Sequence, residues 1–385
     1  MSAQLKQTDT LNNPMLILTI ANGAGHIRVA EGIANAIRAT EPSMPLKVVD
    51  VADYMTSFAH FTHVTTYLWL VKHAPSLWGR IDRYQKKQTG TSPEWYYRRG
   101  CHRLFDLARR VRPRALVATE VGCCEIAALI KRDLRLEAPL VAVNDDYDAD
   151  RAWVQPEVDL YCFVTNELGQ ELVQYGAAGS RIANWGVPLS PGYDVPRERE
   201  KERAEVCGWL LLDPNLPIVL IAGGGEGVGK IEEVAARLLS LDQPAVQLIV
   251  LTGRNERLKS RCERIAVNGS AVRPRVLSWV GPEQMPRLMS AADLMVSKLG
   301  STFNEAIASE LPIIAMEPPP GAECVQYHLL EEWHVGCAVR SLDEVVEQVG
   351  HLLADPELLE QMRRNARAHR TLGVSQRIAR WLVEA

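Results

Sequence analysis

Candidate catalytic and ligand-binding residues occur in this sequence at turns between apolar runs and helical patterns. The stretch 217–238 passes from an apolar run through the turn 223–229, which holds five glycines, into a helix. It nearly matches the phosphate-loop pattern G-x-x-x-x-G-K, but Ile231 stands where a Ser or Thr must hold magnesium. We therefore expect no triphosphate site there. Two alternatives remain, a tight structural turn and a backbone that approaches an anion at a helix N-terminus.

The second half also holds candidates for a diphosphate and sugar site. The motif Gly300–Thr302 opens a helix whose free N–H groups and hydroxyls suit a diphosphate, although the same motif also serves as a plain helix cap. Glu305, about one turn further on, could accept hydrogen bonds from a ribose diol or simply face solvent. Glu323 and Gln326 could meet sugar hydroxyls.

In the first half, His26 is the informative residue because it follows the glycine-bearing turn 21–25 at a helix start. An imidazole there is near-neutral at working pH and could take the proton from an acceptor hydroxyl. Asp145 could orient His26 or be a second base, and Glu120 is a weaker candidate. The alternatives are a histidine that only caps or packs at the turn, and a cation loop at 145–150, whose spacing matches no EF-hand.

Short apolar runs alternate with helical patterns along the whole chain. The expected strands are 15–20, 46–51, 115–120, 139–144, 159–164, 182–187, 217–223, 246–253, 273–280, 293–298 and 311–316. This alternation predicts the α/β class, with parallel sheets covered on both faces. Ligands of such sheets bind at the carboxyl ends of the strands, so we expect the site in a cleft between two domains.

The proline-bearing segment 188–200 interrupts the alternation and marks a linker. We therefore predict two doubly wound, Rossmann-like domains in tandem, one over 1–190 on the acceptor side and one over 191–370. A last helix within 371–385 could cross back to the first domain. A chain of 385 residues is long enough for two separate cores.

Composition excludes several classes of protein. The net charge of −4 gives no basic field for a nucleic acid. The eight cysteines are scattered, so we expect reduced, mostly buried thiols in a cytoplasmic protein. No signal peptide and no membrane-spanning run is recognised, so membrane contact would be peripheral.

Two segments raise the membrane question. Segment 61–80 is apolar and aromatic and contains Trp69 and Trp78, while segment 95–114 interleaves arginines with aromatic residues, among them Trp95, Arg98 and Arg99. Such stretches suit anionic headgroups. The alternative is a solvated helix that packs by its apolar face, and the acidic overall balance argues against a nucleic-acid patch.

The layout GGGxGxG…VGxxxMxxLMxxADLxxxKxGxxxxEAxxxxLPxIxxxPxPGxE resembles the diacylglycerol glycosyltransferases. These are the monogalactosyldiacylglycerol synthases and the processive diacylglycerol glucosyltransferases. More distantly, it is similar to the enzyme that adds N-acetylglucosamine to the peptidoglycan lipid intermediate. The likeness covers roughly residues 14–370. It implies the two-domain GT-B fold, a UDP-sugar donor, inversion of the anomeric centre, and no bound metal or other cofactor.

The resemblance also assigns roles to residues. His26, with Ala24 in place of one family glycine, becomes the acceptor-activating residue, and Asp145 and Trp153 match an acceptor-side loop. Ala322 and Gln326 depart from the family pattern close to the sugar, so glucose, galactose and other hexoses stay open. Backbone at Val280 would hold uracil, Glu305 the ribose and Glu323 the donor sugar. The implied donor-binding set is Gly224, Gly225, Val280, Gly300, Ser301, Thr302, Glu305, Glu323 and Gln326.

We therefore expect an inverting glycosyltransferase that moves a hexose from a UDP-sugar to a lipid hydroxyl, with diacylglycerol as the expected acceptor. It would work in the cytoplasm, attached peripherally to the anionic inner face of the membrane. The alternatives are a UDP-sugar 2-epimerase of the same fold, a non-catalytic nucleotide-sugar sensor, and transfer to a non-glycerolipid acceptor.

Overall fold

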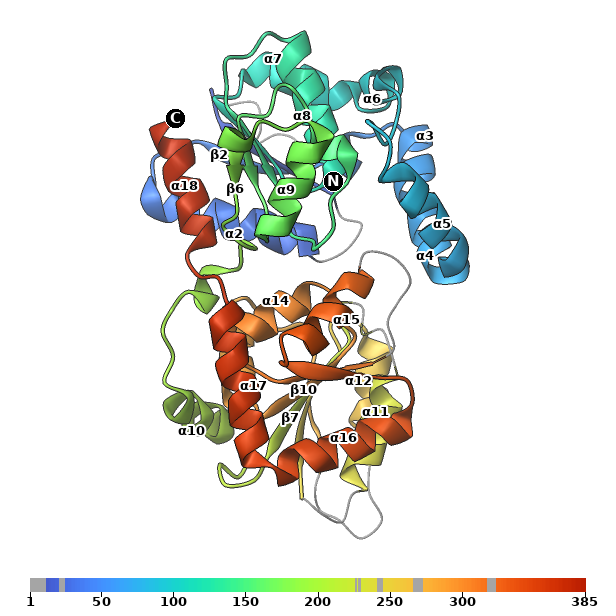
Figure 1. Cartoon of the computed structure of the whole chain (residues 1–385), viewed down its shortest axis with the longest axis vertical. Helices are drawn as coiled ribbons and strands as arrows, with labels where there is room; N and C mark the ends of the chain where they lie inside the picture. The colour runs from blue at the N-terminus through green and yellow to red at the C-terminus, as the bar shows by residue number, and fades with distance from the viewer. Residues whose placement is uncertain are drawn as a thin grey trace. The chain divides into compact units, whose positions relative to one another are not determined.

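A computed structural model of the chain describes residues 12–20, 25–225, 227, 230–240, 245–265, 273–316 and 323–385. The chain divides into two compact units (Figure 1). Unit 1 consists mainly of Met1–Pro191 and Gly373–Ala385, and unit 2 of Gly192–Pro319 and Glu323–Leu372. Each unit contains one six-stranded sheet in which every strand pair is parallel. The predicted pair of doubly wound α/β sheets is confirmed.

The sheet of unit 1 has the strand order β2-β1-β3-β4-β5-β6. Its strands are β1 (Met15–Thr19), β2 (Leu46–Asp50), β3 (Ala115–Ala118), β4 (Leu140–Val143), β5 (Leu160–Cys162) and β6 (Ile182–Ala183). The helical segments of this unit are α2 (Gly25–Thr40), η1 (Val51–Tyr54), α3 (Ser57–His60), η2 (Phe61–Thr65), α4 (Thr66–His73), α5 (Pro75–Gln85), α6 (Glu94–Gly100), α7 (His102–Val111), α8 (Val121–Asp133), η3 (Arg151–Trp153), α9 (Asn166–Tyr175), η4 (Gly179–Arg181) and α18 (Val374–Glu384).

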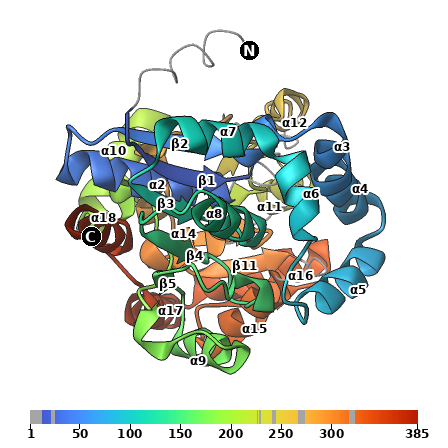
Figure 2. The ribbon, with the colours of Figure 1, turned by 90° about the horizontal axis from the view of Figure 1, so that it is seen from above.

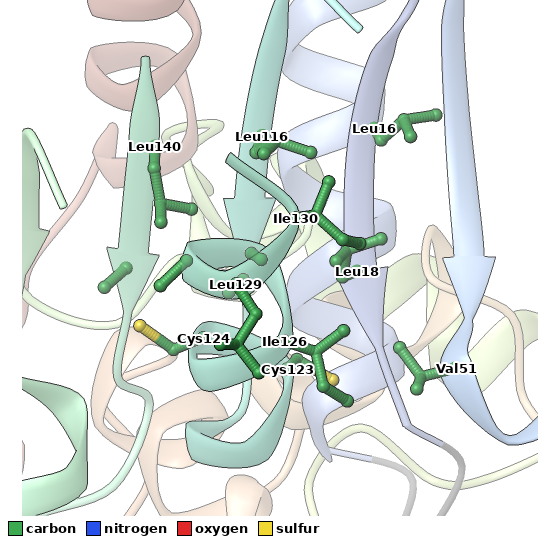
Figure 3. Packing of buried hydrophobic residues seen from close by; sticks show 14 of the residues in the cluster. Leu16, Leu18, Val51, Leu116, Cys123, Cys124, Ile126, Leu129, Ile130 and Leu140 are labelled. Atoms are coloured by element: carbon green, nitrogen blue, oxygen red, sulfur yellow. The ribbon is translucent and has the colours of Figure 1, made fainter. Parts of the chain in front are cut away.

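Strand β1 shows why this sheet must be covered on both faces. Successive side chains of a strand point to opposite faces. Leu16 and Leu18 enter the core beneath α7 and α8, whereas Met15 and Ile17 enter the core beneath α2 and α18. Continuous apolar runs such as MLILT therefore belong to a strand that is buried on both sides. Figure 3 shows α8 lying against the first of these faces.

Helix α18 comes from the other end of the chain and completes the second face of unit 1. Its Val374, Ile378 and Leu382 join the core that α2 and β1 form, and α18 packs against α2 (Figure 1). The Ser375 hydroxyl donates a hydrogen bond of 2.9 Å to the Leu189 carbonyl and ties the start of this helix to the end of the first segment. The last residues of the chain are thus part of the first core.

The sheet of unit 2 has the strand order β12-β11-β10-β7-β8-β9. Its strands are β7 (Ile218–Ala222), β8 (Gln247–Leu251), β9 (Arg275–Leu277), β10 (Leu294–Ser297), β11 (Ile313–Met316) and β12 (Gly336–Val339). The helical segments are η5 (Pro191–Tyr193), at the junction with unit 1, and α10 (Arg199–Leu210), α11 (Ile231–Leu239), α12 (Glu256–Cys262), α13 (Gln284–Ala291), α14 (Ser301–Ala308), α15 (Glu323–Glu332), α16 (Leu342–Ala354) and α17 (Pro356–His369).

Strand β12 was not among the strands expected from the sequence. It reads GCAV, starts with a glycine and is half-buried over its first three residues at the edge of the sheet. A run this short has no clear apolar signature, so pairing with β11 decides its conformation.

Two simpler expectations concern thiols and membrane spans. The cysteines whose side chains are described are all free thiols, six of them buried and Cys337 half-buried. Within the described ranges, no helix combines the length and the apolar character that crossing a bilayer requires.

The core beneath α8 should dominate the stability of unit 1. Leu116 on β3 is fully buried there, so we expect Leu116→Ala to lower the free energy of unfolding by about 2–5 kcal/mol through lost burial and a residual cavity. Urea unfolding followed by the signal of unit 1 measures this change. Val173→Ala on α9, where the side chain is largely exposed, is the control and should change it by less than about 0.5 kcal/mol. Equal effects of the two substitutions would contradict the assignment of this core.

Candidate active site

His26 and Asp145 meet at the carboxyl edge of the sheet in unit 1. His26 lies in the first turn of α2, and its Nδ1 donates a hydrogen bond of 3.0 Å to Oδ1 of Asp145, in the loop after β4. The Asp145 side chain is buried, whereas 23% of the His26 side chain is exposed. The pair therefore has a shielded carboxylate behind an imidazole that a substrate can reach. The turn 21–24 before α2, which contains Gly23 and Ala24, lies outside the described residues.

The topology of the sheet explains this meeting. Strand β1 pairs with β2 on one side and with β3 on the other, so the direction of chain winding reverses between β1 and β3. Loops that follow the strands on either side of such a switch point part from one another and leave a crevice. His26 follows β1, Glu120 follows β3 and Asp145 follows β4. Glu120 caps α8, since its carboxylate accepts a hydrogen bond from the Cys123 N–H.

The charges around His26 change its expected protonation. Burial by itself would lower the pKa of His26, but the charge and hydrogen bond of Asp145, with smaller contributions from Asp146 and Glu120, raise this pKa to about 10. The expectation of an imidazole that is near-neutral at working pH is therefore wrong for the protein without substrates.

The donor-side residues predicted in unit 2 follow four strands of one parallel sheet. Gly224 and Gly225 follow β7, Val280 follows β9 and Gly300–Thr302 follow β10. Glu323 starts α15, which follows β11. Carboxyl ends of parallel strands lie at the same edge, so these loops share one edge of the sheet. Residues 226, 228, 229 and 317–322, which include Glu226 and Ala322, lie outside the described residues, as does the side chain of Glu323.

A close backbone contact fixes the glycine-rich turn after β7. Gly253, in the turn after β8, has φ +60°, and a Cβ there would lie 2.2 Å from the Gly225 carbonyl oxygen. The Arg254 N–H donates to that same oxygen at 2.8 Å. Only a glycine permits this approach, so the turns after β7 and β8 form one unit of backbone. This contact lies between two protein turns, and the predicted approach of the backbone to an anion stays a prediction.

The start of α14 has the features of an anion-binding helix N-terminus. Gly300 precedes the helix with φ 156° and ψ −148°, a region that is essentially restricted to glycine. The first N–H groups of α14 have no acceptor within the helix, and the helix dipole favours negative charge there. Thr302 is buried and Ser301 half-buried.

Glu305 and Gln326 are both buried rather than solvated. The side chain of Glu305 on α14 is 5% exposed, which contradicts the alternative of a solvated helix face. Gln326 on α15 is 2% exposed, and within the described part of the chain its Oε1 accepts no hydrogen bond. A buried amide oxygen without a donor is costly, so this position suits a ligand hydroxyl.

Arg254 and Trp279 are two residues at this edge that sequence reasoning missed. The Arg254 guanidinium lies 4.5 Å from the centre of the Trp279 ring, a cation–π contact at the surface. Trp279 directly precedes Val280, and Arg254 is bound to the glycine-rich turn by its N–H group. Their position beside Gly253 and Val280 was visible in the sequence, but only the fold brings the two turns together.

An exposed aromatic surface lies on α3, η2, α4, α5 and α6, which gather at one end of unit 1 (Figures 1 and 2). We define it by its exposed apolar and aromatic side chains, which are Phe58, Phe61, Leu68, Trp69, Leu77, Tyr84 and Trp95. Trp69 and Trp95 were expected at such a surface. Trp78 is half-buried and packs edge-to-face on Tyr67.

The two predicted arginines and Trp153 behave differently from one another. Arg98 binds Asp133 through two hydrogen bonds of 2.7 and 3.0 Å and also contacts Glu94, so its charge is largely compensated. Arg99 is exposed. Trp153 is buried and packs edge-to-face on Phe163 in the core of unit 1. Its side chain anchors the loop after β4, and we leave it out of any membrane surface.

No group of three or more His, Cys, Asp or Glu side chains in the described ranges is arranged to hold a metal ion.

Comparisons with known proteins identify the class to which this architecture belongs. MurG of Acinetobacter baumannii superimposes with a TM-score of 0.62 at 13% identity over 97% of this chain and 100% of that chain. HepE of Anabaena, solved in complex with UDP-glucose, gives a TM-score of 0.55 at 14% identity over the same shares. The two doubly wound units therefore form a GT-B fold.

Sequence comparisons are more specific than the fold. Residues 26–189 match the family "Monogalactosyldiacylglycerol (MGDG) synthase", and residues 219–369 match "Glycosyl transferases group 1". The processive diacylglycerol beta-glucosyltransferase of Bacillus licheniformis is 27% identical over 368 residues, which are 93% of this chain and 91% of that protein. The chain is a glycosyltransferase and is similar, over nearly its whole length, to the processive diacylglycerol glucosyltransferases.

The His26–Asp145 pair can be tested without any substrate. We expect Asp145→Asn to lower the pKa of His26 from about 10 toward its ordinary value of 6.5, because the charge and the hydrogen bond that favour the imidazolium are lost. NMR titration of the His26 ring protons measures this pKa. Asp106→Asn on α7, an exposed carboxylate paired with Arg109, is the control and should leave it unchanged. A His26 pKa that stays near 10 in Asp145→Asn would refute the pairing.

Proposed function

We propose that the protein transfers a hexose from a UDP-sugar to the free hydroxyl of diacylglycerol, with inversion at the anomeric carbon. The observation that carries this proposal is the His26–Asp145 hydrogen bond at the switch point of the first sheet. A hydroxyl needs a base to become a good nucleophile, and a histidine oriented by a carboxylate is a common solution.

The proposed reaction is a single displacement. The acceptor hydroxyl gives its proton to Nε2 of His26 while its oxygen attacks the anomeric carbon of the donor. The bond from that carbon to the diphosphate oxygen breaks, and UDP leaves with the electron pair. Asp145 accepts the Nδ1–H hydrogen bond throughout and stabilises the imidazolium that forms.

Asp145 raises the pKa of His26, so at neutral pH most molecules carry the imidazolium. Only the molecules in which His26 is neutral can take the proton from the acceptor hydroxyl. The high pKa makes His26 a strong base in that fraction, so the two effects oppose each other. The sign of the pH dependence follows. Transfer should accelerate as the pH rises from 7 toward the pKa of His26, until another group or unfolding limits it.

Unit 2 would bind the donor chiefly through backbone. The diphosphate would lie at the N-terminus of α14, next to Gly300, and meet the turn that Gly253 holds in place. Uracil would bind the backbone at Val280 beside Trp279. The buried Glu305 would accept from the ribose diol, and sugar hydroxyls would donate to Oε1 of Gln326 and to Glu323.

We further propose that the departing diphosphate is stabilised by these N–H groups and the helix dipole, with no bound metal. Preorganised N–H groups can neutralise developing charge in place of a cation. This step is open to direct test with a chelator.

The acceptor and the sugar come from the relatives. The Bacillus licheniformis protein is named for transfer of glucose to diacylglycerol, and the first half of this chain matches a family named for monogalactosyldiacylglycerol synthesis. Diacylglycerol is common to both names, so we propose it as the acceptor. Glucose is the first donor to test and galactose the second.

The proposed function predicts UDP release that depends on both substrates. Purified protein is incubated with UDP-glucose, UDP-galactose or UDP-N-acetylglucosamine, with and without diacylglycerol vesicles, and released UDP is measured. His26→Ala should reduce lipid-dependent release by about 10²–10⁴-fold, as expected for loss of a general base, and leave UDP affinity nearly unchanged. His351→Ala, an exposed histidine on α16, is the matched control.

The same assay separates the alternatives. A 2-epimerase would consume UDP-N-acetylglucosamine without lipid, and a sensor would bind UDP without releasing it from the sugar nucleotide. Full activity in His26→Ala would show that the proposed base is wrong. Excess EDTA should leave the rate unchanged, and a rate lost with EDTA and restored by Mg²⁺ would contradict the metal-free step.

We also propose that the aromatic surface docks on the cytoplasmic inner face of an anionic membrane, where the acceptor lies. Trp and Tyr favour the interface between water and hydrocarbon, and Lys and Arg favour anionic headgroups. The exposed Arg80, Arg83 and Arg99 on α5 and α6 supply positive charge next to the exposed aromatic side chains.

A pair of tryptophan substitutions tests this surface. Trp69→Ser should weaken cosedimentation with vesicles of anionic lipid, because an indole that is 57% exposed in solution can no longer enter the interface. Trp209→Ser on α10, where the indole is 50% exposed, is the matched control in unit 2. If both variants bind vesicles as the unmodified protein does, this surface is not the docking surface. UDP affinity should stay the same in both.

A further inference from the structure

The connection between α5 and α6, residues 86–93, forms hydrogen bonds or ion pairs with the rest of unit 1 near both of its ends. Near its C-terminal end, Glu125 of α8 accepts hydrogen bonds from the Thr91 N–H at 3.0 Å and from the Thr91 hydroxyl. The Tyr97 hydroxyl donates to the same carboxylate at 3.0 Å. At its N-terminal end, Lys86 makes the contacts. The connection therefore has a fixed path between the aromatic surface and the core.

Lys86 binds the loop that carries Asp145. Its Nζ forms an ion pair with the carboxylate of Asp148 and a second one, at 3.0 Å, with Asp82 one turn earlier on α5. Its backbone carbonyl accepts a hydrogen bond of 3.1 Å from the Arg151 N–H. Side chain and main chain of one residue thus hold residues 148–151.

Asn144 connects residues 148–151, which Lys86 holds, to Asp145 in the same loop. The Asn144 side chain donates to the Asp148 carbonyl at 2.8 Å and accepts from the Asp146 N–H at 2.8 Å. These two bonds close the loop around Asp145 on both sides. Asn144 is buried, and its two bonds connect Asp148 to the residues on either side of Asp145.

Electrostatics make Lys86 hard to replace. Its ammonium faces Asp82, Asp148 and Asp150, and burial raises the pKa of Asp150 to about 7 although the charge of Lys86 opposes that rise. Removing the ammonium would leave partly buried carboxylates that repel one another, and the loop would rearrange to separate them.

We propose that Lys86 is a positioning residue for the transfer reaction, which ties α5 of the aromatic surface to the loop whose Asp145 orients His26. Contact of the aromatic surface with lipid would thereby be linked mechanically to the alignment of the base. The effect on transfer rests on the function proposed above, whereas the effect on His26 can be measured without it.

The test compares Lys86→Met with Lys87→Met. Lys87 is the next residue, is exposed and serves as the matched control. For Lys86→Met we expect kcat to fall about ten- to a hundredfold, as for a catalytic group displaced by about 1 Å, while KM for the UDP-sugar changes less than about twofold. Lys87→Met should keep both constants within about twofold.

The His26 titration distinguishes positioning from a simple charge effect. Loss of a nearby positive charge alone would raise the pKa of His26, whereas loss of its alignment with Asp145 would lower it. We therefore expect a lower pKa in Lys86→Met and an unchanged one in Lys87→Met. Lys86→Arg, which keeps the charge, should restore most of kcat.

Asp148→Asn removes the same ion pair from the other side and serves if Lys86→Met fails to fold. It should lower kcat as Lys86→Met does, and kcat is its deciding readout because loss of a nearby negative charge by itself lowers the His26 pKa. The double variant should be no worse than the single ones. If the His26 pKa and kcat of Lys86→Met or Asp148→Asn equal those of Lys87→Met, the proposal is overturned. Absence of any lipid-dependent release by the unmodified protein would instead refute the proposed function, and the titration would still decide the role of Lys86.

Discussion

The hydrogen bond between His26 and Asp145 joins two loops that are 119 residues apart in the chain. It exists because β1 and β4 lie in one parallel sheet, with only β3 between them, and their carboxyl ends reach the same edge. Asp145 is buried, so its charge acts on His26 with little screening by water and favours the imidazolium strongly. Several parts of unit 1 position this contact. The sheet sets the distance between the ends of β1 and β4, α2 carries His26, and Asn144 and Trp153 hold the loop after β4 that carries Asp145.

The two units would contribute different kinds of chemistry to the proposed reaction. Unit 1 offers a titrating side chain whose protonation depends on a neighbour, and that dependence makes it sensitive to small displacements. Unit 2 offers mainly backbone: the start of α14 and the turn pressed against Gly253. Backbone N–H groups carry no ionisable proton, so a donor site built from them would have the same charge at every working pH. This division suits the proposed reaction, in which the acceptor hydroxyl loses a proton and the sugar nucleotide loses UDP as an anion.

The aromatic surface is attached to the same loop as the base-orienting carboxylate. Helix α5 ends at Gln85, Lys86 follows directly, and its contacts lead through Asp148 and Asn144 to Asp145. If the proposed docking and the proposed base are right, this link would align His26 only while the docked helices are in place, and a misaligned base would transfer no sugar to water. Lys86 is half-buried, and its three carboxylate neighbours, Asp82, Asp148 and Asp150, surround the ammonium at this link.

The sequence by itself determined the class of fold and the order of the elements, because apolar runs of four to six residues that alternate with helical patterns fit few architectures other than buried parallel sheets. It also singled out His26, Asp145 and the glycine-bearing turns, since each of them follows an apolar run that was expected to be a strand. It did not determine the protonation of His26, the burial of Trp153 and Glu305, the edge strand β12, or the contacts of Lys86. Each of these depends on which distant residues become neighbours, and burial and charge at a site are properties of those neighbours, which only the tertiary structure decides.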